Sequence, residues 1–140
     1  GLVYPRDIDK AKEWYGAAIH RDSVPGLHGL GMLYYQEKEY QRARELFDRG
    51  AKAGFSPSMN YLAHLYYTGR GGPVDRPKAM AIWERACRLG NVWAKRNLGR
   101  ALAADRAGVL ARIRSRWLQI ESEIDKRLLG IINTHDDRLG

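Results

Sequence analysis

An internal repeat constrains this chain more than any other feature of its sequence. The segments "KAKEWYGAA" (10–18), "RARELFDRGA" (42–51) and "KAMAIWERAC" (78–87) align on an alanine that follows a basic residue: Ala11, Ala43 and Ala79. In each segment two bulky residues, apolar or aromatic, follow three and four positions after that alanine, which is helical spacing. Because the segments lie 32 and 36 residues apart, the chain is predicted to be a stack of similar helical units.

A second recurring segment precedes the later copies and predicts the other helix of each unit. "GLHGLGMLYY" (26–35), "SMNYLAHLYY" (58–67) and "AKRNLGRALA" (94–103) align on Leu30, Leu62 and Leu98, with Gly31, Ala63 and Gly99 directly after. Repeated small residues inside helices suggest that a neighbouring helix approaches closely there, since glycine costs about 1 kcal/mol relative to alanine in a helix. Each unit is therefore expected to be a pair of helices, A and B, in that order.

The turns fall where such pairs need them. Residues 68–77, "TGRGGPVDRP", are rich in glycine and proline and separate an A helix from a B helix. Asp75 is positioned to cap that B helix, with Pro77 in its first turn. Only nine residues precede Lys10, too few for a complete A helix and its turn. The first unit is thus expected to be truncated, in a chain that is a fragment with more repeats upstream.

These residues resemble Sel-one-like repeats, a branch of the tetratricopeptide-like α-solenoids. Segment 58–90 carries the fullest match: Leu62, Leu65, Tyr66, Gly69, Gly71, Asp75, Lys78, Ala79, Trp83, Ala86 and Gly90. Residues 7–18 carry the second half of the motif, and residues 26–54, without the Gly-x-Gly loop, resemble a plain tetratricopeptide unit. The resemblance implies an all-α, α-α superhelix. It also implies a protein-binding adaptor or scaffold, because the family assembles complexes in signalling, membrane-associated quality control and bacterial envelope or host-interaction pathways.

The repeats are expected to occupy residues 1–107, ending with an A helix over 93–106. Apolar residues then recur at steps of three and four, which predicts a long amphipathic helix over 108–132, interrupted near Gly130. We expect this helix to pack on the last repeat in place of its B helix, and residues 133–140 to form a flexible tail. The stripe is also a possible self-association or cap surface: Ile113, Trp117, Ile120, Ile124 and Leu128.

A binding groove is predicted on the concave face that successive A helices form. By analogy with tetratricopeptide units, its positions lie two before, two after and five after each motif leucine. The candidate residues are His28, Met32, Tyr35, Asn60, His64, Tyr67, Arg96 and Arg100. Because the groove ends in two arginines, its partner is expected to be a peptide or protein segment with acidic character; solvated side chains without a ligand are the alternative.

A nucleic-acid-binding protein is the second class that the charge suggests. The chain has a net charge of +8, and segment 85–116 holds nine basic residues but only one acidic residue, Asp105. Phosphate contacts would suit such a segment. However, the alternating Arg112, Arg114 and Arg116 spread around a helix, and aromatic residues for base stacking are scarce there. Nucleic acid is therefore disfavoured as a partner.

Catalysis and metal binding have little support in the sequence. No nucleophile, phosphate-loop or dinucleotide motif is present, so we expect no enzyme activity, catalytic residue or cofactor. His28 and His64 could approach each other on adjacent A helices, but no third ligand is evident, and no metal site is predicted. The single cysteine, Cys87, excludes an internal disulfide. No apolar run is long enough to span a membrane, and a soluble, cytoplasmic rather than periplasmic protein is expected.

Overall fold

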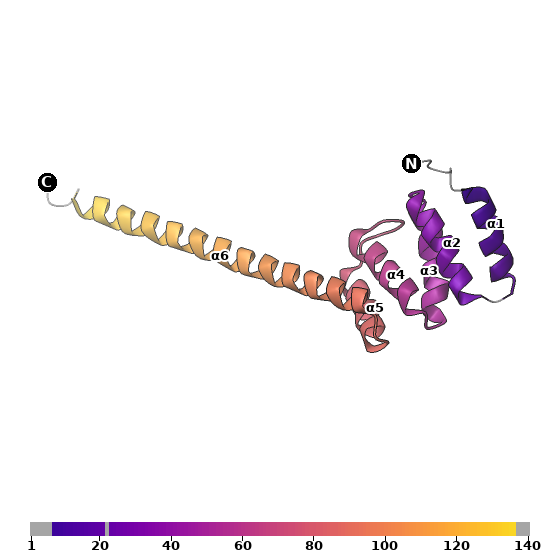
Figure 1. Cartoon of the computed structure of the whole chain (residues 1–140). Helices are drawn as coiled ribbons and strands as arrows, with labels where there is room; N and C mark the ends of the chain where they lie inside the picture. The colour runs from indigo at the N-terminus through magenta and orange to yellow at the C-terminus, as the bar shows by residue number, and fades with distance from the viewer. Residues whose placement is uncertain (1–6, 22, 137–140) are drawn as a thin grey trace, which may run out of the picture. The chain divides into compact units, whose positions relative to one another are not determined.

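The computed structural model describes residues 7–21 and 23–136, and side chains up to residue 130. Every regular element among them is an α-helix (Figure 1). The helices are α1 (Ile8–Ile19), α2 (Val24–Gln36), α3 (Tyr40–Lys52), α4 (Ser56–Thr68), α5 (Arg76–Arg88) and α6 (Val92–Asp136). The chain divides into two compact units, residues 1–99 and residues 100–140.

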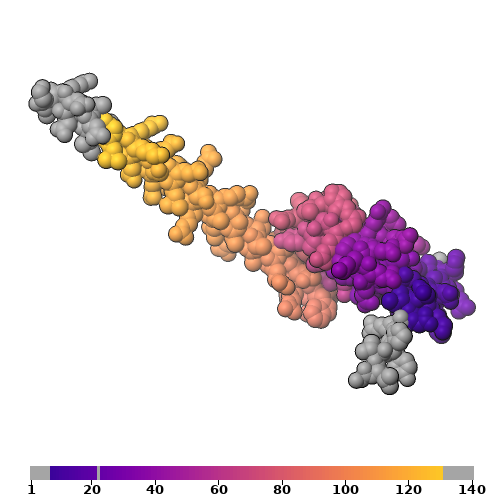
Figure 2. All heavy atoms as spheres, turned by 90° about the horizontal axis from the view of Figure 1, so that it is seen from above, coloured from indigo at the N-terminus to yellow at the C-terminus, as the bar shows by residue number. Residues whose placement is uncertain are grey.

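The first unit is an array in which each helix packs on the next one along the chain. Contacts join α1 to α2, α2 to α3, α3 to α4 and α4 to α5. The space-filling view shows these successive helices in close contact (Figure 2). Packing of each helix mainly on its neighbours in sequence is typical of solenoids, in which stability comes from each repeat and its neighbours. The predicted all-α helical-repeat fold is therefore confirmed.

The B helices bury the second of their two bulky residues. Phe47 in α3 and Trp83 in α5 occupy the same repeat position and are 0% and 2% exposed. Their counterpart in α1, Tyr15, is 37% exposed and lies against Gly29 of α2. Trp14, the first of the two bulky residues in α1, is 78% exposed. Helix α3 packs against both α2 and α4, and α1 packs against α2.

The small residues of the A helices differ in how closely other atoms approach them. A Cβ atom on Gly31 would lie 2.7 Å from Cε1 of Phe47, and Ala63 is fully buried. At Gly99, by contrast, no atom lies within 4 Å of an added Cβ. The predicted close approach of a neighbouring helix is thus present at the first two positions and absent at the third, as far as the described residues show.

The Gly-x-Gly loop between α4 and α5 owes its sequence to backbone geometry. Gly69 and Gly71 have φ angles of +72° and +74°, which residues with a side chain rarely adopt. A Cβ on Gly71 would also lie 2.5 Å from the carbonyl group of Tyr40 at the start of α3. Asp75 then caps α5 as predicted, accepting a hydrogen bond of 3.0 Å from the Lys78 amide.

Helix α6 differs from the predicted boundaries. A single helix runs from Val92 to Asp136, so the expected turn near residue 107 and the break at Gly130 are both wrong. Residues 108–132 are not a separate helix that turns back on 93–106, and a cap that requires this turn is not supported. Residues 133–136 of the predicted tail are helical, while residues 137–140 lie outside the described residues.

The continuity of α6 has a local cause. Its sequence from residue 92 onward contains no proline and is rich in alanine, leucine and arginine, which are good helix formers. A single interior glycine costs only about 1 kcal/mol relative to alanine, so Gly108 and Gly130 do not end the helix. The side chains of the predicted stripe, from Ile113 to Leu128, are about half exposed.

Candidate functional site

A hollow of about 450 Å³ lies within the repeat unit, between α4 and the first turns of α6. We call it the asparagine groove, because three of its six residues are asparagines. It is lined by Pro57, Asn60, Tyr61, Asn91, Trp93 and Asn97. The groove brings together one A helix and the beginning of the next, which is where a repeat array presents side chains to a ligand.

Asn91 sets the start of α6 against the start of α4. Its side-chain oxygen accepts a hydrogen bond of 2.9 Å from the Ala94 amide, and therefore caps α6. Its side-chain nitrogen donates to Oγ of Ser56 at 3.4 Å. One amide side chain thus both begins α6 and joins it to α4.

Asn60 connects three helices beneath the groove. Its Oδ1 atom accepts hydrogen bonds from Nε1 of Trp83 in α5 at 3.1 Å and from Nδ2 of Asn97 in α6 at 3.0 Å. The backbone carbonyl of Asn60 lies 3.3 Å from the same indole nitrogen. The buried Trp83 has its only polar atom satisfied in this way, which a buried indole requires.

Two polar atoms of these amides remain available. Among the described residues, neither Nδ2 of Asn60 nor Oδ1 of Asn97 has a hydrogen-bond partner. One is a donor and the other an acceptor, the two functions that a peptide group needs. Because the shared Asn60–Asn97 bond holds both side chains, the free donor and the free acceptor are kept in fixed positions.

Aromatic surface adjoins these amides. Trp93, in the first turn of α6, is 65% exposed. Tyr61 of α4 also lines the groove, and its ring is stacked on that of Phe47 at a centroid distance of 5.2 Å. An exposed tryptophan beside fixed hydrogen-bonding groups is the composition that binding surfaces favour.

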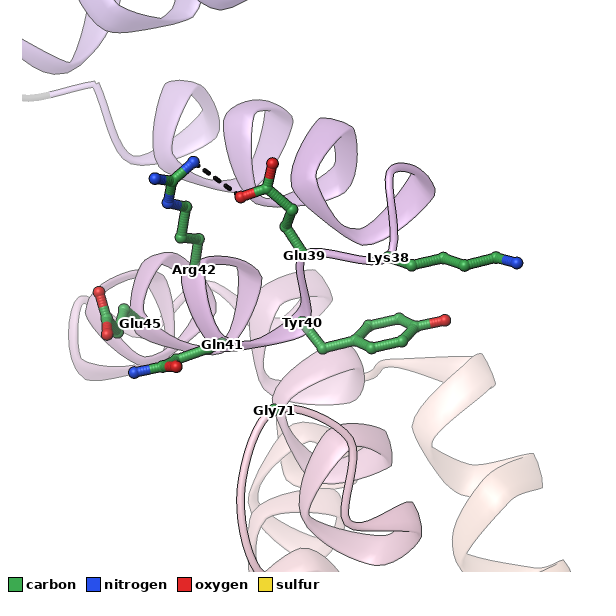
Figure 3. A pocket seen from close by; sticks show the side chains of 7 residues that line it. All are labelled: Lys38, Glu39, Tyr40, Gln41, Arg42, Glu45 and Gly71. Carbon is green, nitrogen blue, oxygen red and sulfur yellow. Dashed lines mark hydrogen bonds and ion pairs between the residues drawn. The ribbon is translucent and has the colours of Figure 1, made fainter.

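A larger hollow of about 600 Å³ lies at the turn between α2 and α3. Figure 3 shows its lining side chains: Lys38, Glu39, Tyr40, Gln41, Arg42, Glu45 and Gly71. Arg42 and Glu39 neutralise each other in an ion pair of 2.7 Å. In the same view, the Lys38 side chain points away from that pair. The hollow is mainly charged and its groups do not converge, so the asparagine groove is the better candidate.

Comparison with protein families decides the classification of the chain. The Sel1 repeat model matches residues 1–23, 25–55 and 56–91. These three segments cover more than half of the chain. The chain belongs to the Sel1 repeat family. The matched segments coincide with α1, with the α2–α3 pair, and with the α4–α5 pair, which confirms the repeat units predicted from the sequence.

Relatives of the Sel1 repeat chain include two frog proteins and a bacterial structure. Cytochrome c oxidase assembly factor 7A from Xenopus laevis is 29% identical over 87 residues, which are 57% of this chain and 38% of that protein. Cytochrome c oxidase assembly factor 7 from Xenopus tropicalis is 26% identical, with the same shares. The chain thus spans well under half of these relatives. A crystal structure of a Sel1 repeat protein from Oxalobacter formigenes matches with a TM-score of 0.66 and 30% identity, over 78% of this chain and 46% of that one.

Of the eight residues that the sequence singled out for partner binding, only Asn60 lines the asparagine groove. His28 instead lies half-buried among aromatic rings, 5.5 Å from Phe47, 5.4 Å from Phe55 and 5.7 Å from Tyr61 between ring centroids. Its Nδ1 atom lies 3.2 Å from Oγ of the fully buried Ser58. Burial lowers the pKa of His28. These contacts place the ring in the packing between Sel1 repeats.

Two predicted tyrosines also make contacts within the array. Tyr35 packs edge-on against Tyr40 and Tyr61, at 5.4 and 5.5 Å. Tyr67 packs on Trp83 at 5.5 Å, and the Arg76 guanidinium lies 5.3 Å from its ring. Both rings are half-buried, so each stabilises a helix contact and also leaves part of its surface to solvent.

The remaining predicted residues are dispersed. Met32 and His64 are half-buried, and the pKa of His64 is lowered by burial and by the nearby Arg70. Arg96 is exposed on the repeat-unit part of α6, while Arg100 begins the second unit. A role of these residues in partner binding stays a prediction. No group of three or more metal-ligating side chains comes together in the part of the chain that the structure describes.

Sequence reasoning missed Tyr61, Asn91, Trp93 and Asn97. A signal was present: Tyr61 and Asn97 each stand one position before a motif leucine, so the repeat places them on the same side of successive A helices. The analogy with tetratricopeptide units pointed to other positions of the same helices.

No described helix is long and apolar enough to cross a membrane.

Proposed function

We propose that this Sel1 repeat chain is a non-enzymatic protein-binding module, an adaptor or scaffold, that holds an extended peptide segment in the asparagine groove. The observation that carries the proposal is the fixed pair of free amide atoms, Nδ2 of Asn60 and Oδ1 of Asn97, beside the exposed Trp93. The amides would bind the peptide backbone, and the indole would cover an apolar side chain. Such division between backbone and side-chain contacts is how extended peptides are recognised.

Exposed basic residues on α5 and on the start of α6 favour an acidic segment. Lys95 and Arg96 are exposed on α6 next to Asn97, and Arg85 and Arg88 are exposed in the last turns of α5. Cationic side chains on a protein surface attract acidic partners and raise their association rate. The frog relatives are named as assembly factors, and an assembly factor that brings proteins together would need a module of this kind.

The test uses a phage-displayed library of random linear peptides, selected on the full chain. Selected peptides are expected to be enriched in aspartate and glutamate and to bind with a dissociation constant of about 1–100 μM. Trp93→Ala is expected to weaken binding about 30-fold, since central aromatic residues contribute about 2 kcal/mol or more. Trp14→Ala is the matched control, because Trp14 is also exposed in the repeat unit but lies on α1.

Equal binding by the wild type and the Trp93→Ala variant would contradict the proposal. Loss of binding in the Trp14→Ala variant alone would move the site to α1. Binding of a generic RNA with steep salt dependence, and no peptide selection, would support the nucleic-acid alternative for segment 85–116.

A further inference from the structure

The second unit carries a regular apolar seam on α6. Five exposed side chains follow one another at alternating steps of three and four residues: Leu110, Ile113, Trp117, Ile120 and Ile124. Each is between 46% and 62% exposed. This is the a/d spacing of a coiled coil, in which the seam of one helix is buried by the seam of another.

Charged residues beside the seam form two groups of opposite sign. Arg112, Arg114 and Arg116 precede the middle of the seam, and Glu121, Glu123 and Asp125 follow it. All six are exposed, and among the described residues none of them takes part in an ion pair. The charges are therefore available to a partner whose own charges are arranged in the reverse order.

A second copy of α6, running in the opposite direction, has that arrangement. The two charged groups are mirror images in the sequence about the point between Leu118 and Gln119. We propose that two chains associate through an antiparallel coiled coil of their α6 helices, centred at this point. Ile113 then faces Ile124 of the second copy, and Trp117 faces Ile120. In each case an a position meets a d position, as antiparallel packing requires.

The same register aligns the flanking charges. Arg114 and Glu121 occupy e positions and face each other across the dimer, while Arg116 and Glu123 occupy g positions and do likewise. Two-fold symmetry doubles these contacts to four pairs of opposite charge. At the two ends the seam residue Leu110 faces Arg127 of the second copy, and the exposed Val109 and Leu128 lie beside this layer at flanking g and e positions. The paired region is then twenty residues, about 30 Å long.

A parallel dimer fits less well. It would keep only the pairing of Arg116 with Glu121, twice per dimer, and would leave Arg114 and Glu123 opposite apolar residues. It would also place Trp117 of one chain opposite Trp117 of the other, and it would bring the two groups of arginines side by side. Charges at the flanking positions set helix orientation, and here they favour the antiparallel one.

The first experiment measures association and orientation on the full chain. Sedimentation equilibrium at about 1–100 μM is expected to show a monomer–dimer equilibrium. For orientation, a spin label is attached to Ala104→Cys in a Cys87→Ser background. In an antiparallel dimer the two labelled positions lie about 43 Å apart along the helix axis. In a parallel dimer they lie side by side, within about 30 Å including the label arms. A label on Ser115→Cys, near the centre, is the control and should give a short distance in both cases.

The second experiment tests the charge pairs. Arg114→Glu places like charges opposite each other and is expected to weaken the dimer at least tenfold. Arg112→Glu is the matched control, since position 112 points away from the seam, and should leave the dimer unchanged. Two double variants, Arg114→Glu with Arg116→Glu, and Glu121→Arg with Glu123→Arg, should each be monomeric alone. Mixed in equal amounts, they should form a heterodimer.

Circular dichroism separates these effects from loss of the helix, because α6 should stay helical in every variant. A helical chain that stays monomeric at the highest concentration would overturn the proposal and leave the seam to a different protein. A label distance below about 30 Å at position 104 would also overturn it, in favour of a parallel dimer. Equal effects of Arg112→Glu and Arg114→Glu would refute the register.

Discussion

Replacing Gly31 by alanine is expected to destabilise the repeat unit, although alanine is the better helix former. Gly31 lies in the middle of α2, and an added Cβ would lie 2.7 Å from Cε1 and 2.9 Å from Cδ1 of Phe47. Real carbon atoms do not approach so closely without a shift of one partner. Phe47 is fully buried and its ring contacts His28 and Tyr61, so the ring cannot move without disturbing the α2–α3–α4 packing.

The magnitude follows from two opposing effects. Overpacking of a well-packed core costs about 1–3 kcal/mol. Replacing a helical glycine by alanine contributes about 1 kcal/mol of stability. The net loss is therefore about 1 kcal/mol and at most about 2 kcal/mol. In a unit of about 100 residues, each kcal/mol lowers the melting temperature by about 4–8 °C.

The assay is urea unfolding followed by circular dichroism, together with thermal melting. Gly16→Ala is the control, because Gly16 is also inside a helix, α1, but an added Cβ there meets no atom within 4 Å. This control is expected to raise the free energy of unfolding by about 0.5–1 kcal/mol through helix propensity alone. The same chemical change at two helical glycines should thus have opposite signs.

A Gly31→Ala variant as stable as Gly16→Ala would refute the close approach of Phe47. A double-mutant cycle adds a second criterion. In a Phe47→Leu background the aromatic edge is gone, so Gly31→Ala should cost less than in the wild type. An unchanged cost would show that the loss arises elsewhere.

Two further predictions concern polar groups of the repeat unit. Asn60→Ala should lower the free energy of unfolding by about 1–2 kcal/mol in the urea assay, because it leaves the buried Trp83 indole with only its longer hydrogen bond. An unchanged free energy of unfolding would contradict a stabilising role of the Asn60 side chain. Stability should also fall as the pH drops from about 7.5 to 5.5, since burial lowers the pKa of His28 and of His64 and unfolded histidines titrate near 6.5. Well above pH 6.5 both histidines are neutral in the folded and the unfolded chain, so stability is at its full value. As the pH falls below about 6.5, the unfolded chain binds protons more readily than the folded chain, and the free energy of unfolding decreases. The urea midpoint measures this, and His28→Gln should flatten the dependence; a flat wild-type profile would contradict it.

The sequence by itself determined the repeat, the helix pairs and their turns. Local rules suffice for these features: the spacing of Phe47 and Trp83 after their alanines, the two glycines of the α4–α5 loop, and the cap at Asp75 all act within a few residues. The same rules predicted the close contact at Gly31, because a small residue at a repeated helical position signals a neighbour.

The position of each side chain relative to other helices was decided only by the tertiary structure. His28 was expected on an open surface, yet it packs against rings from Phe55 and Tyr61, which lie about thirty residues away. The asparagine groove depends on hydrogen bonds that Asn60 accepts from Trp83 of α5 and Asn97 of α6, and helical periodicity does not encode such partners.

The long helix shows the same division of information. Periodicity correctly predicted the apolar stripe of α6, since a stripe is a property of one helix. It did not predict that residues 92–136 form a single helix, because a turn at Gly108 would have required a packing surface strong enough to offset the hydrogen bonds lost there. Local propensity continues a helix when no tertiary contact competes, and whether one competes is decided by the folded structure.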